Sequence, residues 1–220
     1  GFAVTMGMAE QRDDGLSGAT ERRAMLGEAT KRLRDGTVLG VQVGSLSEAE
    51  GPLASSAGGA FGFDGDADTV FTGLFAATPL SSQATLFGRW GQGFTDGDAL
   101  NGGLWRGGDT IRSESFALGT TLRQDTGTWS FTASRPLRVT SGHAVLGVPV
   151  GRAMDGSVLY RDASVDLAPS GAQTDLELSW SATLADNQRL VLGGMLTLQP
   201  GHDADAGPAF AAGAKYRFRW

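Results

Sequence analysis

Apolar and polar residues alternate along most of this chain. In the segment "TDLELSWSATL", Leu176, Leu178 and Trp180 fall on one side, and Asp175 and Glu177 fall on the other. Successive side chains of a β-strand point to opposite faces of the sheet, so a period of two indicates a strand. The pattern predicts strands with one bulky apolar face and one face of small or polar residues.

Segments of this kind recur along the chain, and short polar connections such as "RQDTGT" and "ADNQ" separate them. These connections are rich in turn-forming residues. We count about ten to twelve candidate strands, a spacing typical of antiparallel barrels and sandwiches. The predicted fold is all-β, an antiparallel meander closing as a barrel of about 10–12 strands in a single domain, 1–220. Residues 1–8 form the predicted first strand, and 37–220 form the meander.

One segment departs from the alternation. Residues 17–36, "SGATERRAMLGEATKRLRDG", contain no proline and many helix formers. Leu26, Ala29 and Leu33 have the spacing of one helical stripe, and Gly36 is a suitable C-terminal cap. The segment is predicted to be a helix inserted after the first strand. It either covers one end of the sheet or lies across a barrel mouth, where its basic residues meet acidic lumen groups.

The face that is buried decides the class of protein. A soluble barrel points its bulky side chains inward, whereas an outer-membrane barrel points them at lipid and lines its lumen with small or polar groups. The second face here is mostly Ser, Thr, Gly and Ala, which favours a membrane barrel. Arg161 argues against it, because it alternates in phase with Leu159 and Val165, and an arginine in mid-bilayer costs roughly 2–4 kcal/mol. Pro136 lacks a ladder donor and is expected at an edge or bulge.

The composition of the chain excludes several kinds of partner and site. The net charge of −6 gives no basic excess for phosphates, so no nucleic-acid partner is expected. The absence of cysteine excludes disulfides and thiolate metal sites, which suits an envelope or secreted protein as well as a cytosolic one. No apolar run approaches the roughly 18 residues of a membrane helix. Since the chain opens in mid-pattern without an initiating methionine, we expect it to be part of a longer or processed protein.

The last strand carries a specific signal. Apolar side chains occupy every second position up to the final residue, with Tyr216, Phe218 and Trp220 on one face. This arrangement resembles the C-terminal assembly signal of bacterial outer-membrane barrels. The resemblance implies that the barrel-assembly machinery and outer-membrane lipid are partners, and that the strand closes the barrel against the first one.

A broader resemblance covers most of the chain after residue 36. The elements "RPLRV", "LAPSG" and "QPGHDA" are its most specific parts. They resemble the C-terminal region of alphaproteobacterial subtilisin-like serine peptidases, which are large secreted proteins of an autotransporter-like kind. The resemblance implies a non-catalytic β-domain that follows an N-terminal protease passenger at the outer membrane or cell surface.

No catalytic constellation is visible. None of the three subtilase triad motifs is present, and Ser141 and Ser170 lie outside any nucleophile-elbow motif. His143 has no acid near it in the sequence. His202 precedes Asp203, a pair that can orient an imidazole, although the turn context favours a solvated side chain. The chain is predicted to be no enzyme and to need no cofactor.

Acidic residues alternate in one glycine-rich segment. Asp64, Asp66 and Asp68 in "FDGDADT" have the spacing of calcium loops, and Asp203 and Asp205 repeat it in "GHDADAG". Calcium takes six to eight oxygens, and no closing glutamate follows. We interpret these residues as acidic hairpin tips. A weak calcium site at Asp64, Asp66 and Asp68 is the alternative, and no firm metal site is predicted.

These observations leave three functional hypotheses. The first is the non-catalytic β-barrel of a secreted subtilisin-like protease, which anchors or translocates the passenger at the outer membrane. The second is a soluble β-barrel or β-sandwich module, secreted or periplasmic, that binds the protease or its substrate. The third is an independent small channel of the outer membrane. A continuous apolar belt on the outer surface distinguishes the membrane hypotheses from the soluble one.

Overall fold

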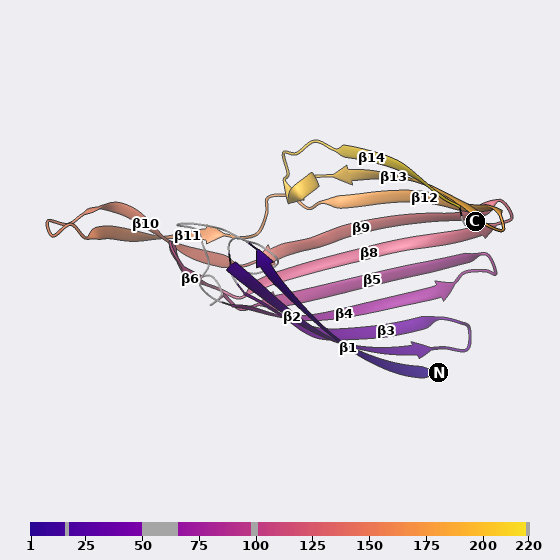
Figure 1. Ribbon diagram of the computed structural model, residues 1–220, viewed down its shortest axis with the longest axis horizontal. Helices are drawn as coiled ribbons and strands as arrows, with labels where there is room; N and C mark the ends of the chain where they lie inside the picture. Colours follow the sequence, from indigo (N-terminus) through magenta and orange to yellow (C-terminus); the bar gives the residue numbers. More distant parts are fainter. Residues whose placement is uncertain (16–17, 50–65, 98–100, 219–220) are drawn as a thin grey trace.

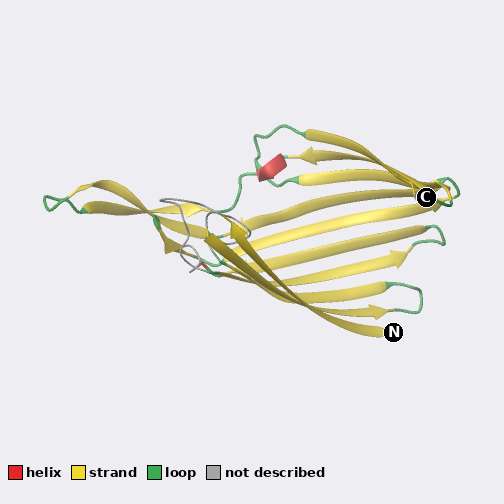
Figure 2. Cartoon of the chain, viewed as in Figure 1, coloured by secondary structure: helices red, strands yellow, loops and turns green. Residues whose placement is uncertain are grey.

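A computed structural model describes residues 1–15, 18–49, 66–97 and 101–218. Within these ranges the chain forms two antiparallel sheets (Figures 1 and 2). The ten-stranded sheet is composed, in spatial order, of β1 (Phe2–Gly15), β2 (Gly18–Arg32), β3 (Val38–Glu48), β4 (Ala67–Pro79), β5 (Ala84–Thr95), β8 (Ile111–Gln124), β9 (Gly127–Ser141), β12 (Thr174–Ala185), β13 (Gln188–Leu198) and β14 (Ala209–Phe218). The four-stranded sheet is composed of β11 (Val158–Asp166), β10 (His143–Arg152), β7 (Trp105–Gly108) and β6 (Asn101–Gly102).

The predicted all-β class and the antiparallel meander are confirmed. In the ten-stranded sheet each strand pairs with the next one in sequence, except where β6–β7 and β10–β11 are inserted. The first strand continues past residue 8 to Gly15. A one-turn 3-10 helix, η3 (Pro200–His202), interrupts the connection between β13 and β14.

The predicted helix at 17–36 is wrong, because β2 occupies Gly18–Arg32. This strand is paired on both sides, with Met25 opposite both Met8 of β1 and Ser45 of β3. Differences in helix propensity among ordinary residues are at most about 0.7 kcal/mol each. The ladders of hydrogen bonds with β1 and β3 outweigh that local preference. Gly36 instead adopts φ 87° in the turn that follows β2, a conformation that suits glycine.

The predicted barrel closure is not found. Strands β1 and β14 lie at opposite edges of the curved sheet, and no register joins them in the described part of the chain (Figure 1). Neighbouring strands must approach to about 4.8 Å to share hydrogen bonds. The curl of the ten strands stops short of that distance, so the structure shows an open sheet.

The two ends of the large sheet differ. Short turns at 33–37, 80–83, 125–126 and 186–187 connect strands at one end, which we call the turn end. The start of β1 and the end of β14 lie at this end (Figure 1). At the opposite end, the loop end, longer connections follow β3, β5, β9 and β13. This asymmetry is typical of outer-membrane barrels, which have short turns on one side and long loops on the other.

Three phenylalanines of the large sheet lie on glycines of a neighbouring strand. Phe75 lies opposite Gly40, and a Cβ added to this glycine would fall inside the aromatic ring. Phe71 and Gly44, and Phe87 and Gly119, repeat the arrangement. The glycines are therefore required by space, because each leaves a flat recess for a ring.

The smaller sheet is attached at the loop end. Hairpin β10–β11 projects beyond the large sheet, and β10 also pairs with β7 (Figure 1). Ile111 and Ala144 form a buried cluster at the junction of the two sheets. The Arg106 guanidinium lies 4.9 Å from the ring centroid of Tyr160 and fastens β7 to the hairpin.

Asp155 holds the turn of this hairpin. Its Oδ1 accepts hydrogen bonds from the Ser157 hydroxyl at 2.6 Å and from the Ser157 backbone N–H at 2.9 Å. The hydroxyl bond first, and the N–H bond second, lower the pKa of Asp155 below its ordinary value of 3.8. These hydrogen bonds therefore stabilise the hairpin turn fully at pH values above the ordinary pKa of 3.8. The stabilisation of the turn is lost as the pH falls through the lowered pKa of Asp155.

We predict that the amide resonance of Ser157 titrates in acid with a midpoint below that of aspartate in a peptide. An NMR titration measures it, and Asp155→Asn should abolish the transition. A midpoint at or above the peptide value would contradict the hydrogen-bonded turn.

Candidate functional site: an apolar outer face and a hollow inner face

Alternation gives the large sheet two faces of opposite chemistry. We call the face that carries Leu178 the outer face and the face that carries Ser179 the inner face. The registers extend the outer face across all ten strands. Its bulky apolar members include Val4, Met6, Met8, Val41, Val43, Val70, Leu74, Trp90, Phe94, Leu118, Leu122, Trp129, Phe131, Leu178, Leu192, Leu196, Phe210, Tyr216 and Phe218.

Burial is inverted relative to a water-soluble protein. Met6 is 86% exposed and Leu178 is 50% exposed on the outer face. The largest fully buried side chains of the described residues are instead polar, and all belong to the inner face: Glu48, Thr95 and Ser113. An apolar surface that crosses ten strands far exceeds the few hundred Å² tolerated on soluble monomers. The outer face therefore requires an apolar covering.

The apolar belt runs obliquely to the hydrogen-bonded rows. One row of register partners begins at Phe2 on β1 and ends at Phe210 on β14. On β1 the belt starts from this row near the turn end and extends towards the loop end. On β14 the belt starts from the same row near the loop end and extends towards the turn end. The full row is Phe2, Lys31, Leu39, Ala76, Gly88, Leu118, Ala133, Leu176, Leu196 and Phe210. Across the sheet the belt thus shifts along the strands by nearly its own height. Such a stagger is what strands tilted against a barrel axis require.

The two borders of the belt carry different residues. Near the turn end of the later strands the indole rings of Trp129 and Trp180 lie 6.3 Å apart. Towards the loop end arginines lie over phenylalanines, with Arg135 5.2 Å from the ring of Phe116. Glu114 lies 4.0 Å from the Arg135 guanidinium. Aromatic rings and long cationic side chains at the edges of an apolar belt are the groups found where lipid meets water.

The structure places both sequence features that argued against a membrane barrel. Arg161 belongs to β11 in the smaller sheet at the loop end. Pro136 lies where the β8–β9 register shifts, between the partners of Glu114 and Phe116. This register shift agrees with the expectation that the proline lies at an edge or a bulge, and Arg161 is not part of the belt on the large sheet.

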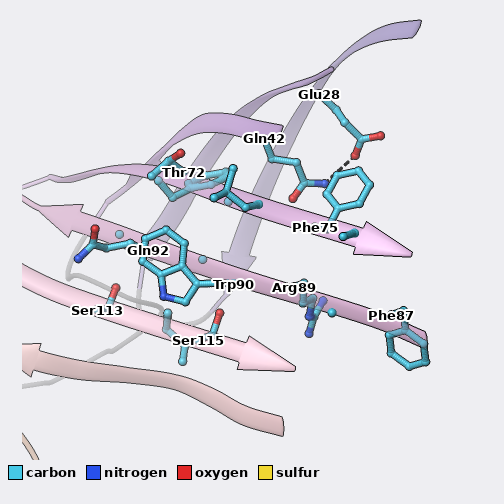
Figure 3. A pocket seen from close by; sticks show the side chains of 18 of the residues that line it. Glu28, Gln42, Thr72, Phe75, Phe87, Arg89, Trp90, Gln92, Ser113 and Ser115 are labelled. Carbon is cyan, nitrogen blue, oxygen red and sulfur yellow. Dashed lines mark hydrogen bonds between the residues drawn. The ribbon is translucent and has the colours of Figure 1, made fainter. Parts of the chain in front are cut away.

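The inner face contains a hollow of about 650 Å³ over β2–β5 and β8 (Figure 3). Gln42 Nε2 donates a hydrogen bond of 2.6 Å to Glu28 Oε2 on its wall, close to Phe75. The Ser113 side chain is buried, and its Oγ has no hydrogen-bond partner among the described residues. Short polar side chains and recessed aromatic rings leave this face open.

The predicted assembly signal is partly described. Tyr216 and Phe218 share the outer face, and β14 is paired with β13 over its whole length. The expectation that the terminal strand is docked is confirmed for these residues. Trp220 lies outside the described residues, and recognition by the assembly machinery stays a prediction.

The calcium candidates are only partly described. Asp64 lies outside the described residues, and Asp66 is exposed. Asp68 accepts a 2.7 Å hydrogen bond from the Ser47 hydroxyl. No group of three His, Cys, Asp or Glu side chains within the described ranges is placed to hold a metal ion. Asp203 is engaged by the backbone N–H of Asp205 at 2.9 Å.

The histidines and candidate serines have structural contacts. His202 Nδ1 accepts a 3.0 Å hydrogen bond from the Gln173 N–H, and its Nε2 lies 3.1 Å from the Leu137 carbonyl. Ser170 Oγ accepts the N–H of Ala204. Sequence reasoning missed the partner of His143, which is Asp109 at 3.5 Å, because the two are far apart in the chain. No hydrogen bond joins a serine hydroxyl to a histidine ring in the part of the chain that the structure describes.

Comparison of the chain with known proteins finds no matching family model, no matching curated protein and no matching solved structure. Among the described residues, none of the helical segments has the length and hydrophobicity needed to cross a bilayer.

Proposed function

We propose that this chain is the non-catalytic C-terminal β-domain of a secreted subtilisin-like peptidase, and that it anchors or translocates the passenger at a bacterial outer membrane. One observation carries the proposal, namely the inverted burial of the large sheet. Its exposed face is a belt of Leu, Val, Met and aromatic side chains, and its shielded face is polar. Lipid satisfies that arrangement and water does not.

The subtilisin-like assignment rests on the sequence resemblance, whereas the membrane assignment rests on the belt. The short turns, the start of β1 and the end of β14 all lie at the turn end of the sheet (Figure 1). In outer-membrane barrels the end with the short turns faces the periplasm. The longer connections and the smaller sheet then lie on the cell-surface side, where a passenger would be held. The barrel-assembly machinery is the proposed partner during insertion.

We further propose that the sheet closes in the membrane by antiparallel pairing of β1 with β14. These strands run in opposite directions, as closure of an even number of strands requires. Matching the two belts places Val4 opposite Tyr216 and Met6 opposite Ala214. The oblique course of the belt supplies the stagger that this pairing needs.

Paired cysteines test the closure cleanly, since the chain contains no cysteine of its own. Met6→Cys combined with Ala214→Cys should form a disulfide in the membrane-inserted protein, because opposed Cβ atoms approach to about 4–5.5 Å. The bond should change migration in non-reducing electrophoresis. Met6→Cys combined with Ala211→Cys, which places the second thiol on the inner face, is the control. Equal cross-linking of both pairs, or of neither, would contradict the proposed seam.

Flotation with phospholipid vesicles tests the membrane assignment. The detergent-refolded protein should float with vesicles, resist alkaline extraction and aggregate when detergent is removed without lipid. Recovery of a monodisperse, folded protein in plain buffer would support the soluble module instead, because a soluble protein would have to bury the belt against its own chain.

A further inference from the structure

The inner face carries a concentration of positive charge at its turn end. Four side chains form this group, which we call the basic cluster: Arg123 of β8, Arg189 of β13, and Lys215 and Arg217 of β14. Arg189 lies directly opposite Arg217 in the β13–β14 register. Lys215 lies on the same face, two residues before Arg217.

Two adjoining hollows bring these side chains together. Arg123 and Arg189 line a hollow of about 400 Å³. Arg189, Lys215 and Arg217 line a second one of about 210 Å³. Because Arg189 borders both hollows, the four cations form one continuous rim and are not isolated surface charges.

The sheet provides little internal compensation for this charge. Among the described residues, no carboxylate lies within ion-pair distance of any of the four, and the Arg189 guanidinium donates a hydrogen bond of 3.4 Å to the Ser181 hydroxyl. In the described part of the chain, Asp125 is the one carboxylate that lines the first hollow, and the four cations outnumber it, so the cluster is net positive. Like charges directly opposite each other on paired strands destabilise a sheet. A nearby anion relieves that repulsion.

The inner face of β1 leaves room for these long side chains in a closed barrel. Ala3, Thr5 and Gly7 occupy its inner-face positions, as the β1–β2 register shows. On β12, the inner-face carboxylates of Asp175 and Glu177 lie near the loop end and away from the cluster. On β8, β13 and β14 the basic side chains of the inner face therefore lie at the turn end, whereas Arg89 of β5 and Arg22 of β2 lie elsewhere on this face.

We propose that the basic cluster makes the turn-side mouth of the barrel lumen selective for small inorganic and carboxylate anions. This inference rests on the closed membrane barrel of the proposed function. Rings of Arg and Lys select anions in pores, because low-dielectric walls focus the field of fixed charges along the water-filled path. An anion entering between Arg189 and Arg217 gains their attraction and removes their mutual repulsion.

Reversal potentials in planar phospholipid bilayers test the proposal. Under a KCl gradient the wild-type protein should pass chloride in preference to potassium. Arg189→Gln combined with Arg217→Gln should lower the chloride-to-potassium permeability ratio by about threefold or more. Lys215→Gln alone should lower the permeability ratio by a smaller factor. This single variant keeps the experiment informative if the double variant fails to fold. Lys31→Gln, which removes one charge from the outer face, is the matched control and should leave the ratio unchanged.

Salt provides a second readout. The preference should weaken between about 0.1 M and 1 M KCl, because the Debye length falls from about 10 Å to about 3 Å. A protein that inserts into vesicles but passes potassium preferentially, or passes no ions, overturns this inference alone. Failure to insert into vesicles overturns the proposed membrane function and the inference with it.

Discussion

If the proposed membrane barrel is right, Leu178→Arg should destabilise the inserted protein by roughly 2–4 kcal/mol, because the guanidinium would lie in lipid in the middle of the apolar belt. Leu178 is 50% exposed and lies between Phe131 of β9 and Gly194 of β13 on the outer face. In a protein surrounded by water, an arginine at such an exposed position changes stability by only about 0.5 kcal/mol. Tryptophan fluorescence during guanidinium unfolding from phospholipid vesicles measures the difference.

Ser179→Arg is the matched control for this variant. The same residue is introduced one position further along β12, but it points to the inner face, where its cross-strand neighbours are Ser130 and Gly193. This variant should retain nearly wild-type stability. A small effect of Leu178→Arg, or equal losses in the two variants, would contradict lipid contact at the outer face.

Gly40→Ala should cost about 1–3 kcal/mol through overpacking, because the new methyl group occupies the position of the Phe75 ring. Unfolding of the inserted protein in denaturant measures this loss as well. Gly213→Ala is the matched control, since a Cβ there meets nothing within 4 Å.

A double variant separates ring displacement from a general effect on the strand. Phe75→Leu removes part of the ring, so Gly40→Ala should cost less in its presence, and the two changes should be coupled by about 0.5–3 kcal/mol. Strict additivity would show that Phe75 and Gly40 do not act as a packed pair.

The sequence predicts the parts of this fold in which local chemistry and pairing agree. In β12 and β14 every second residue has the same character, so strand, face and turn follow from the chain alone. In β2 the charged residues and helix formers hide the period of two, and only pairing with β1 and β3 decides the outcome. The strand is specified by neighbours that a local pattern does not reveal.

Long-range contacts lie beyond such reasoning. Phe75 and Gly40 meet only because the β3–β4 register brings them together, although more than thirty residues separate them in the chain. The basic cluster likewise depends on the β13–β14 register, which sets Arg189 against Arg217. The aromatic face of the last strand was predictable, because its residues are close in sequence and share one strand.

The order of strands in the large sheet has a consequence for how the protein folds. Nearly every strand pairs with its predecessor in the chain, so most ladders close only a short loop and cost little chain entropy. Such a sheet can grow by adding one hairpin after another, with the most recent strand always forming the growing edge. Among the described strands of this sheet β14 follows β13 in the chain, so in this mode of growth it is added after β13. Until it arrives, β13 presents an open edge, and stalled intermediates would be prone to pair with other chains.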